Sequence, residues 1–439
     1  MKIAIAGTGY VGLVTAVCLA HKGHMVTCVD VDENKIKMLQ SGKSPIYEND
    51  LEELMQQNTE RLTYTTDYLA AYKDADVIFI GVGTPEKKDG SANLTYVYEV
   101  AKQIAQSAEK ECIVVVKSTV PVGTNDKVEA VLQKQKMHDV VLEVASNPEF
   151  LAQGTAVRDT LHASRIVLGV ESKHAEDVLR EVYAGFEAPI LVTNRRSAEM
   201  IKYASNDFLA LKISYVNEIA NLCELVGADI QDVTSGMGLD PRIGSQFLNA
   251  GIGYGGSCFP KDTKALHWLA NFHDYEIKTI KAAIEVNEQQ KLKLFKKSRK
   301  YYESLNGVTV AVLGLTFKPG TDDLREAPSL VNVPLMLDEG AIVHAWDPAG
   351  VENFKKEMQR YQEYDLSKIH YCNTPQETVK NADICFVFTE WPEVKTMQPE
   401  DFLVMNKAIV MDGRNCFSLG AMQHEGIVYE SIGRNIDVI

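Results

Sequence analysis

The chain has 439 residues, which is too long for one ordinary hydrophobic core and suggests two or three domains. Hydrophobic residues make up 45% of the chain and charged residues 24%, as in soluble globular proteins, and no apolar run reaches the roughly 18 residues that a membrane span needs. The formal net charge of −15 argues against a general affinity for nucleic acids or anionic lipids, because both repel a strongly acidic protein.

The N-terminal stretch MKIAIAGTGYVGLVTAVCLA has one Lys followed by apolar residues, as a signal peptide does. Three glycines interrupt this stretch, and it leads into a strand pattern that ends at Asp30. We therefore expect the stretch to belong to the folded domain and the protein to be cytoplasmic.

The eight cysteines are scattered and form neither a CxxC pair nor a metal-ligand spacing with histidine, so we expect no metal site. Four of them, Cys18, Cys28, Cys112 and Cys385, lie inside apolar runs, where a reduced cysteine is a small core residue. Cys258 does not lie in such a run.

The first part of the chain alternates short β-branched runs with helical patterns. The apolar runs predict buried strands of a parallel sheet that is covered on both faces, at residues 2–7, 25–30, 76–83, 112–119 and 140–146. Helical patterns lie between them, for example at Val11–His21 and Val97–Ala108. This βαβ alternation predicts a Rossmann-like NAD-binding domain over residues 1–195.

The first predicted strand runs into a glycine-rich turn with the pattern GxGxxG, formed by Gly7, Gly9 and Gly12. The first glycine permits a tight turn, the second lets the backbone approach a pyrophosphate, and the third lets helix and strand pack closely. The phosphates would lie at a helix N-terminus, where free N–H groups favour anions. The pattern alone is weak evidence, but the flanking strand and helix and the acidic end of the next strand fit a dinucleotide site.

Asp30, at the end of that next strand, predicts which dinucleotide binds. Its carboxylate can accept hydrogen bonds from ribose hydroxyls, whereas a 2′-phosphate would meet like charge, so NAD is favoured over NADP. We expect a preference of about tenfold or more. Lys35 could offset this preference, or it is an ordinary solvated lysine of the first helical turn.

A long helix is predicted from Ser197 to just before Gly227, because the chain there has helical periodicity without Gly or Pro. Such a helix would extend roughly 45 Å. Its many apolar positions suggest that it packs against a second subunit, in a homodimer or a higher homo-oligomer. We expect residues 196–305 to form a central helical dimerisation segment, interrupted by the Gly-rich stretch 251–256.

The βαβ pattern begins again at Gly307, with strands predicted at residues 308–317, 341–348, 382–391 and 408–414. The predicted architecture is therefore α/β, with two doubly wound Rossmann-like domains joined by a long central helix and a helical segment. The second of these domains would comprise residues 306–439.

The sequence GIGYGGSCFPKD at residues 251–262 is the least ordinary stretch of the chain. Four glycines in six residues let the backbone lie close to a ligand, and Cys258, Lys261 and Asp262 follow. Nearby cations lower the pKa of a thiol and increase its thiolate fraction, so Cys258 is a candidate nucleophile. The alternative is a flexible loop with a buried thiol.

Two further groups of polar residues are candidates for the site. Lys202 and Asn206 are four residues apart on the predicted long helix, so they share one face and could donate to a developing oxyanion. The alternative is ordinary solvated helix polarity. Glu149 and Phe150 follow the strand that ends near Ala145, and the carboxyl ends of strands are where α/β sheets bind ligands.

Six blocks of the sequence, found in order over nearly the whole chain, resemble the family of nucleotide-sugar dehydrogenases that includes the UDP-glucose and GDP-mannose dehydrogenases. The blocks are AGTGYVG (6–12), KSTVPVGT (117–124), NPEFLAQGTA (147–156), KYASNDFLALKISYVNEIA (202–220), FLNAGIGYGGSCFPKD (247–262) and LGLTFKPGTDDLREAP (313–328). GGSCFPKD and FKPGTDDLRE are the most specific parts.

The resemblance implies an NAD-dependent, four-electron oxidation of UDP-glucose to UDP-glucuronate, in which C6 of the sugar becomes a carboxylate and two NADH form. The thiolate of Cys258 would capture the aldehyde as a thiohemiacetal. A second hydride transfer would give a thioester, which water would hydrolyse. Tethering keeps the reactive aldehyde from escaping and divides a difficult oxidation into easier steps.

The resemblance also implies roles for the polar residues. Lys202 and Asn206 would stabilise oxyanions. Asp262 would handle protons together with Thr119 and a bound water, and Glu149 would assist hydrolysis of the thioester.

The resemblance further implies two sets of binding residues. The positions implied to contact NAD are Gly7, Gly9, Tyr10, Val11, Gly12, Asp30, Lys35, Thr84, Thr119, Gln153, Lys261 and Arg325. The positions implied to line the UDP-sugar site are Glu149, Phe150, Leu151, Gln153, Lys202, Asn206, Arg242, Phe247, Leu248, Asn249, Gly251, Gly255, Lys318 and Arg414. Arg242 could act across a subunit boundary. Lys318 and Arg414 suit a diphosphate on chemical grounds alone, or are ordinary surface charges.

The sequence departs from the family pattern at two places. Gln153 stands where the family usually has Glu, so NAD affinity could differ because hydrogen-bonding capacity is kept while a charge is lost. Ala163-Ser164-Arg165 stands where Pro-Asp-Arg is common, and we expect a different loop conformation after Asp159.

Two alternative functions stay open. A sibling enzyme would act on GDP-mannose or a UDP-N-acetyl sugar, although Phe259 beside Cys258 resembles the UDP-glucose branch. A non-catalytic regulator that binds NAD or a nucleotide sugar would be expected to lose Cys258, Lys202 or Asp262, and all three are present.

Overall fold

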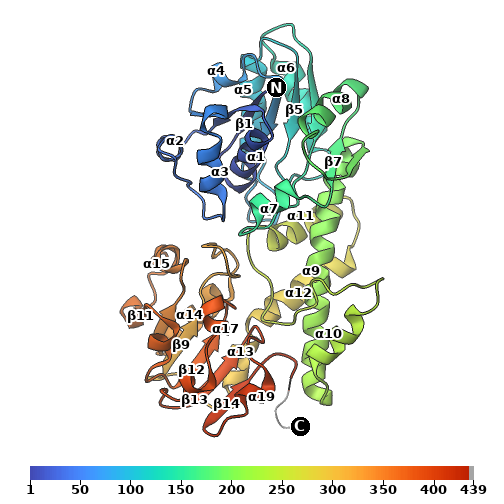
Figure 1. The fold of residues 1–439 in the computed structure, drawn as a ribbon. Helices are drawn as coiled ribbons and strands as arrows, with labels where there is room; N and C mark the ends of the chain where they lie inside the picture. The colour runs from blue at the N-terminus through green and yellow to red at the C-terminus, as the bar shows by residue number, and fades with distance from the viewer. Residues whose placement is uncertain (435–439) are drawn as a thin grey trace. The chain divides into compact units, whose positions relative to one another are not determined.

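The computed structural model describes residues 1–434, and its contacts divide the chain into two compact units, Met1–Ser205 and Asn206–Ile439 (Figure 1). Each unit is built around a sheet with helices on its faces, so the predicted α/β architecture is confirmed. The predicted division into segments 1–195, 196–305 and 306–439 stays a prediction.

The first unit contains an eight-stranded sheet in the order β3-β2-β1-β4-β5-β6-β7-β8. Its strands are β1 (Lys2–Ala6), β2 (Met25–Val29), β3 (Leu62–Thr65), β4 (Val77–Ile80), β5 (Cys112–Val116), β6 (Leu142–Ser146), β7 (Ile166–Gly169) and β8 (Ile190–Thr193). The five predicted strands are present. β3, β7 and β8, each four residues long, were not predicted.

The first six strands in chain order run parallel, whereas β7 meets β6 in an antiparallel pairing of Ser146 with Gly169. The five predicted strands, β1, β2, β4, β5 and β6, are parallel, as the apolar runs predicted, and the antiparallel pairing joins them to β7, which was not predicted. The apolar content of a strand does not record its direction, which depends on the connection that precedes it.

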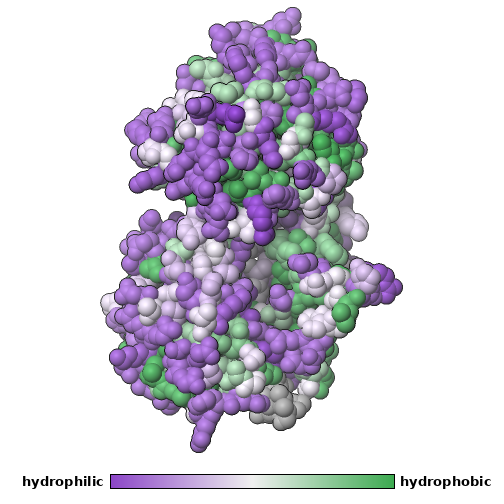
Figure 2. Space-filling model, viewed as in Figure 1, coloured by the Kyte–Doolittle hydropathy of each residue, from purple (hydrophilic) through white to green (hydrophobic). Residues whose placement is uncertain are grey.

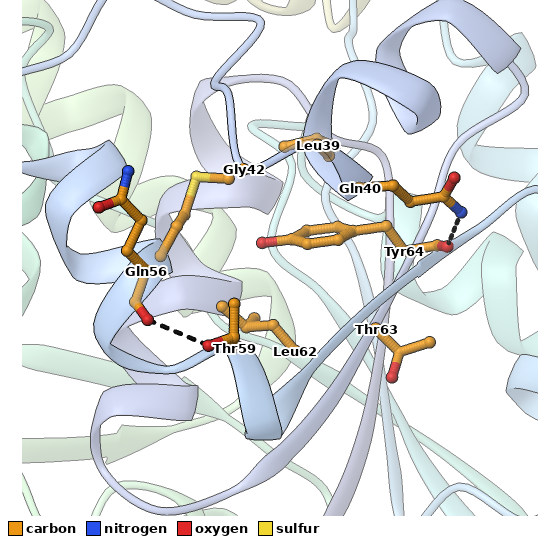
Figure 3. Close-up of a pocket in the computed structure, with 9 residues that line it drawn as sticks. Leu39, Gln40, Gly42, Gln56, Thr59, Leu62, Thr63 and Tyr64 are labelled. Atoms are coloured by element: carbon orange, nitrogen blue, oxygen red, sulfur yellow. Dashed lines mark hydrogen bonds between the residues drawn. The ribbon is translucent and has the colours of Figure 1, made fainter.

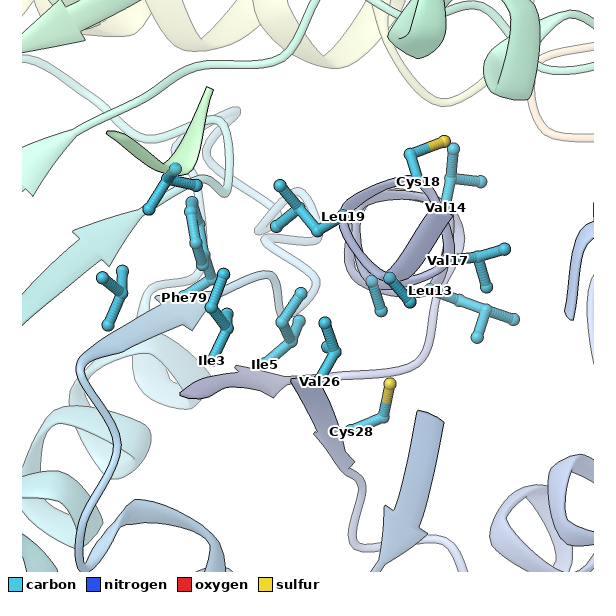
Figure 4. Close-up of a cluster of buried hydrophobic side chains, with 14 of the residues drawn as sticks. Ile3, Ile5, Leu13, Val14, Val17, Cys18, Leu19, Val26, Cys28 and Phe79 are labelled. Atoms are coloured by element: carbon cyan, nitrogen blue, oxygen red, sulfur yellow. The ribbon is translucent and has the colours of Figure 1, made fainter. Parts of the chain in front are cut away.

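The helical elements of the first unit are α1 (Tyr10–His21), α2 (Glu33–Gln40), α3 (Leu51–Gln57), η1 (Thr59–Arg61), α4 (Tyr68–Tyr72), α5 (Thr95–Ser107), α6 (Thr124–Gln135), α7 (Ala156–Leu161) and α8 (Lys173–Val182). Helix α1 is apolar all round, and its residues 12–20 are all buried, because β1, β2, α3 and α7 surround it; Leu13 and Leu19 are among the core residues on this face of the sheet (Figure 4). On β1, Ile3 and Ile5 belong to the core on this face, while Ala4 and Ala6 belong to the core on the other face. The alternation shows why the strand is apolar from Ile3 to Ala6.

Helix α9 (Arg195–Val226) begins in the first unit and continues into the second. Asn194 accepts a hydrogen bond from the backbone of Ser197 at 2.8 Å, and Gly227 ends the helix with a φ of 78°. The predicted long helix is thus confirmed to within two residues at its start.

The second unit contains a six-stranded, all-parallel sheet in the order β11-β10-β9-β12-β13-β14. Its strands are β9 (Thr309–Leu313), β10 (Ile342–Trp346), β11 (Ile369–Tyr371), β12 (Ile384–Val387), β13 (Ala408–Asp412) and β14 (Ile427–Glu430). The four predicted strands are present, and the short edge strands β11 and β14 complete the sheet.

The helical elements that follow α9 in the second unit are α10 (Ile230–Gly238), α11 (Phe259–Phe272), α12 (Lys278–Lys291), α13 (Lys293–Ser298), α14 (Pro328–Asp338), α15 (Val351–Met358), η2 (Leu366–Lys368), α16 (Pro375–Val379), α17 (Pro392–Lys395), α18 (Pro399–Phe402) and α19 (Leu419–Met422). Among residues 1–434, no helix combines the length and apolar character needed to cross a bilayer.

The four cysteines expected in the core, Cys18, Cys28, Cys112 and Cys385, are all buried. Cys258 is half-buried instead. Polar side chains dominate the surface in the view of Figure 2.

Candidate functional site

The glycine-rich turn joins β1 to α1 in the first unit. Gly7 has a φ of 95°, a backbone conformation that is strained for residues with a side chain. A Cβ on Gly12 would lie only 1.9 Å from the carbonyl oxygen of Gly7. A Cβ on Gly9 would meet no atom within 4 Å, so the space over this residue is open. Helix α1 also begins without a side-chain cap. The open glycine and the uncapped N–H groups fit the approach of a pyrophosphate.

Asp30 lies immediately after β2. Its carboxylate accepts hydrogen bonds from the backbone N–H and the hydroxyl of Thr8, at 2.8 and 2.6 Å, and from the backbone of Asp32 at 3.0 Å. Burial raises the pKa of Asp30, but these hydrogen bonds and the charge of Lys35 outweigh it, so the pKa lies below its ordinary value. The carboxylate is therefore ionised and held at the end of the strand, as an acceptor for ribose hydroxyls must be.

The ends of the neighbouring strands supply further predicted cofactor residues. The Thr84 hydroxyl, after β4, donates to the carbonyl oxygen of Thr119, after β5, at 2.9 Å. The Tyr10 hydroxyl donates to the carbonyl oxygen of Tyr47. The turn, Asp30 and the two threonines therefore all lie at the carboxyl edge of the parallel strands, where α/β sheets bind ligands.

Glu149 and Lys202 form a buried ion pair in the first unit. Lys202 Nζ lies 2.8 Å from Glu149 Oε1, and the side chains are 3% and 6% exposed. The backbone N–H of Leu151 donates to Glu149 Oε2 at 2.8 Å, and the Phe150 ring lies 5.5 Å from the ammonium. The alternative of solvated helix polarity is thus wrong for Lys202, because this lysine is buried against the loop that follows β6.

Lys117 is a second buried lysine in this region, and no sequence argument had singled it out. It donates to Asn147 Oδ1 at 2.9 Å, beside Tyr183. The pKa of Lys117 is lowered to about 8, because burial, helped by the charge of Lys202, lowers it more than the charge of Glu149 raises it. The position of Lys117 directly after β5 was a usable signal, since strand ends carry site residues.

Arg165 is another residue that the sequence did not indicate as functional. Its guanidinium lies 3.9 Å from the centre of the Phe150 ring, and it donates to the Ser205 hydroxyl at 3.1 Å. Arg165 thereby holds one face of the predicted substrate loop through a cation–π contact. This segment follows the departure at Ala163-Ser164.

In the second unit, the glycine-rich stretch 251–256 is buried and held by amide side chains. Asn217 of α9 accepts from the backbone of Gly251 at 2.8 Å, and Gln290 of α12 donates to the carbonyl oxygen of Gly251 at 2.7 Å. Asn287 bonds both backbone groups of Tyr254, at 2.7 and 3.0 Å. The alternative of a flexible loop is therefore wrong, and these three amides are functional candidates that sequence reasoning missed.

The glycines of this stretch are required by close packing. A Cβ on Gly255 would lie 2.6 Å from the carbonyl oxygen of Glu326, and one on Gly256 would lie 2.7 Å from the Phe317 ring. The backbone N–H of Gly256 also donates to the carbonyl oxygen of Arg325 at 2.7 Å. The two most specific sequence blocks therefore lie against each other.

Cys258 occupies the N-cap position of α11, with Ser257 Oγ 3.8 Å from its sulfur. The positive end of a helix stabilises a thiolate. Next to it, the Phe259 ring packs edge-on against Phe247 and Tyr254, with centroids 6.1 and 5.8 Å apart. Cys258 is thus a half-buried residue directly before an aromatic cluster, and this position is compatible with its predicted role as a nucleophile.

Asp262 lies one turn into α11 and is 1% exposed. Asn206 Nδ2 donates to one carboxylate oxygen at 2.7 Å, and Lys261 Nζ donates to the other at 2.6 Å. Three predicted residues therefore meet in one hydrogen-bonded group, called the Asp262 group below.

Arg414 lines a cavity of about 420 Å³ in the second unit. Its guanidinium donates to the carbonyl oxygens of Gly253 and Phe388 at 3.0 and 2.9 Å, which joins the cavity to the glycine-rich stretch. The cavity is lined by Ile230, Gln231, Thr234, Leu248, Asn249, Ala250, Glu390, Lys395, Arg414, Asn415 and Cys416. Leu248, Asn249 and Arg414 were predicted, whereas the residues of α10 and of the loop after β12 were not.

Three of the remaining predicted residues have a side-chain contact with a residue near them in the sequence. Arg325 forms a bidentate pair with Asp323, and Arg242 forms one with Asp240; both guanidinium groups are exposed. The Lys318 ammonium lies 5.6 Å from the centre of the Phe317 ring. Their roles, and that of Gln153, stay predictions.

A second cavity, of about 330 Å³, lies between the ends of α2 and α3 and the start of β3 (Figure 3). It contains none of the predicted residues. It lies by the opposite ends of the strands from the glycine-rich turn, since β3 begins there.

Comparisons with known proteins agree with this geometry. Three domain models of the UDP-glucose/GDP-mannose dehydrogenase family match the chain: the NAD binding domain at residues 1–187, the central domain at 196–289 and the UDP binding domain at 311–419. UDP-glucose 6-dehydrogenases of Bacillus subtilis (strain 168) and Rhizobium meliloti (strain 1021) are 46% and 43% identical, over 99% of this chain and 98% and 100% of theirs. The structure of a UDP-glucose dehydrogenase from Pyrobaculum islandicum matches with a TM-score of 0.91 at 36% identity, covering 99% of this chain and 98% of that one.

Proposed function

Because the chain belongs to the UDP-glucose/GDP-mannose dehydrogenase family, with NAD as its cofactor, we propose that it oxidises UDP-glucose to UDP-glucuronate. UDP-glucose, two NAD and one water would give UDP-glucuronate, two NADH and three protons. The observation that carries the proposal is the Cys258 thiol at the N-terminus of α11, four residues before the buried Asp262.

The first unit fits NAD, because Gly9 leaves open space at an uncapped helix N-terminus and Asp30 presents an ionised carboxylate after β2. When bound, NAD supplies the hydride acceptor for both oxidations. Gly7 and Gly12 keep the turn tight, and Asp30 would accept hydrogen bonds from the ribose hydroxyls.

Cys258 would act as the covalent catalyst. Its sulfur forms a bond to the C6 carbon of the aldehyde, and the carbonyl oxygen takes up a proton to give a thiohemiacetal. Loss of a hydride and a proton leaves a thioester. Water then adds to the thioester carbon, the C–S bond breaks, and the thiolate is released together with a carboxylic acid that ionises.

Lys202 and Asn206 would stabilise the negative charge that develops on the reacting oxygen, because an ammonium and an amide N–H are strong donors when they are buried and preoriented. The two residues are one turn apart on α9. Lys202 already donates a hydrogen bond to Glu149, and Asn206 donates one to Asp262. These carboxylates therefore orient the donors before the substrate reacts.

Asp262 would also transfer protons, with Thr119 and a bound water, as the substrate alcohol and the thiohemiacetal are oxidised. Glu149 would orient the water that hydrolyses the thioester. A carboxylate can accept the proton of an attacking water and return it to the leaving thiolate.

The cavity beside Arg414 would hold the nucleotide. Arg414 and Lys395 supply cations for a diphosphate, Asn249 and Asn415 supply amide groups for a base or ribose, and Leu248 supplies an apolar surface. The volume of about 420 Å³ is in the usual range for small-molecule sites.

A second copy of the chain would cover one side of α9. Phe208, Tyr215 and Leu222 are spaced by seven residues and are 61%, 50% and 52% exposed, so they form one apolar stripe on the helix. Apolar side chains also gather over α9 in the view of Figure 2. We infer a homodimer or a higher homo-oligomer, and Phe208→Glu should shift the mass measured by light scattering towards the monomer.

The assay that tests the proposed function counts NADH formed per UDP-glucose consumed. Two NADH support the covalent four-electron reaction, and one NADH indicates a simple alcohol dehydrogenase. A higher kcat/KM for GDP-mannose or a UDP-N-acetyl sugar would assign the chain to a sibling activity. No NADH with any nucleotide sugar would identify a non-catalytic binding protein and overturn the proposal.

A further inference from the structure

Helix α9 carries a second buried carboxyl group immediately after Asn206. Asp207 is 1% exposed, and neither of its carboxyl oxygens has a hydrogen-bond partner among residues 1–434. Asp262, in contrast, has a donor on each oxygen. A buried polar group without a partner destabilises the fold, and a buried charge does so more strongly, so this carboxyl requires an explanation.

The groups that act on Asp207 come from two elements. Asp262 and Lys261, both on α11, exert their charges on Asp207. Tyr254, in the glycine-rich stretch, is the third titratable neighbour: burial raises its pKa to about 12, and the charge of Asp207 contributes to the increase. Two carboxyl groups therefore face one ammonium, that of Lys261.

The ammonium of Lys261 is bonded to Asp262, which makes Asp262 the compensated carboxylate of the pair. The pKa of Asp207 is raised to about 8, because burial and the negative charge of Asp262 raise it more than the charge of Lys261 lowers it. Asp207 is therefore neutral at pH 7 and loses its proton slightly above physiological pH.

We propose that Asp207 is a positioning residue for the reaction, which holds a proton beside the Asp262 group, so that the two carboxyl groups Asp207 and Asp262 together carry a single negative charge. The inference rests on the proposed function. When Asp207 releases its proton to solvent, a second negative charge competes with Asp262 for Lys261 and opposes charge development on the reacting oxygen. Only the protonated form then supports full activity.

The test compares the wild type with Asp207→Asn, whose side chain has nearly the same shape and stays neutral. The measurement is kcat/KM for UDP-glucose at saturating NAD between pH 6.5 and 9.5, because kcat/KM reports ionisations of the form that has not yet bound the sugar. Glu218→Gln is the matched control, since it removes an exposed carboxylate from the same helix.

We expect wild-type activity to fall by about tenfold per pH unit above pH 8, as for a single essential proton. Asp207→Asn should stay within about threefold of the wild type at pH 7 and lack this fall, while Glu218→Gln follows the wild type. An Asp207→Asn profile of the same shape as the wild type, whether at equal or reduced activity, would overturn the proposal.

A second measurement does not depend on turnover. The folded pKa of Asp207 lies above its unfolded value, so the folded state retains a proton that the unfolded state has lost, and the contribution of Asp207 to stability should fall as pH rises from about 4 to 8. In urea unfolding, the stability of Asp207→Asn relative to the wild type should therefore increase between pH 5 and 8.

Equal pH dependence of unfolding in the two proteins would refute the buried proton, whether or not the enzyme turns over UDP-glucose. If the wild type forms no NADH with UDP-glucose, the proposed function fails, and with it the positioning role. If the wild type is active and Asp207→Asn has the same pH profile of kcat/KM, the positioning role is refuted while the proposed function stands.

Discussion

Lys202 and Glu149 form an ion pair, with 2.8 Å between Nζ and Oε1, in which both side chains are almost completely buried. Lys202 lies on α9 and Glu149 follows β6, so 53 residues of sequence separate the two groups. A charge buried at this depth is stable only with its partner. The pair therefore fixes the ammonium in one position before any substrate arrives.

Lys202→Met should lower kcat by about 10²- to 10³-fold and change KM much less, because a buried donor to a developing oxyanion acts mainly in the transition state. The substitution also leaves Glu149 without its cation and should cost about 3–5 kcal/mol of stability. Steady-state kinetics and urea unfolding measure the two effects. The double variant Lys202→Met/Glu149→Gln should recover much of the lost stability but none of the lost kcat. If Lys202→Met changes KM alone, the role of Lys202 is restricted to substrate binding.

Cys258→Ser should abolish formation of the acid, with a loss of at least about 10³-fold, because a hydroxyl at this position is a far weaker nucleophile than a thiolate. Cys372→Ser is the control, since Cys372 is also a half-buried thiol of the second unit and should retain full activity. Product analysis by chromatography distinguishes acid from aldehyde. Normal turnover of the Cys258 variant would remove the nucleophile assignment.

Gly9→Ala and Gly12→Ala should have opposite consequences although both lie in the same turn. A Cβ on Gly9 meets open space, so the variant should fold normally and bind NAD at least about tenfold more weakly, because the methyl group occupies the approach of the pyrophosphate. A Cβ on Gly12 would collide with Gly7, so that variant should lose stability without NAD present. Thermal unfolding and NAD titration separate the two outcomes, and equal Tm values would contradict the packing role of Gly12.

Lys117→Met should change how stability depends on pH. The pKa of Lys117 is lowered to about 8 by burial, below its unfolded value, so between about pH 8 and 10.5 the unfolded state binds a proton that the folded state does not. Wild-type stability should therefore gain up to about 3 kcal/mol over this window relative to the variant. If the free energy of unfolding of the wild type and of the variant changes equally with pH, the pKa of Lys117 is not lowered by folding.

Much of the fold was predictable because it depends on local patterns. Neighbouring residues alone produce the apolar runs of β1, β4 and β12 and the uninterrupted periodicity of α9. The predicted elements are present in the folded structure. The antiparallel edge at β7 was not predictable, because strand direction depends on the chain that comes before it. For the site, the sequence indicated Cys258, Lys202 and Asp262 without indicating their partners.

The sequence by itself determined the two sheets, the long helix, the glycine-rich turn and the residue types that can perform the chemistry, since each follows from local backbone preference or from a short motif. The tertiary structure alone decided that Lys117 and Asp207 are buried. It also decided that Asn217 and Asn287 bond the backbone of the glycine-rich stretch, and that Asn206 donates a hydrogen bond to Asp262. The physical reason is that the pKa of a side chain and its hydrogen bonds depend on desolvation and on partners distant in the chain, and neither is encoded in any local segment.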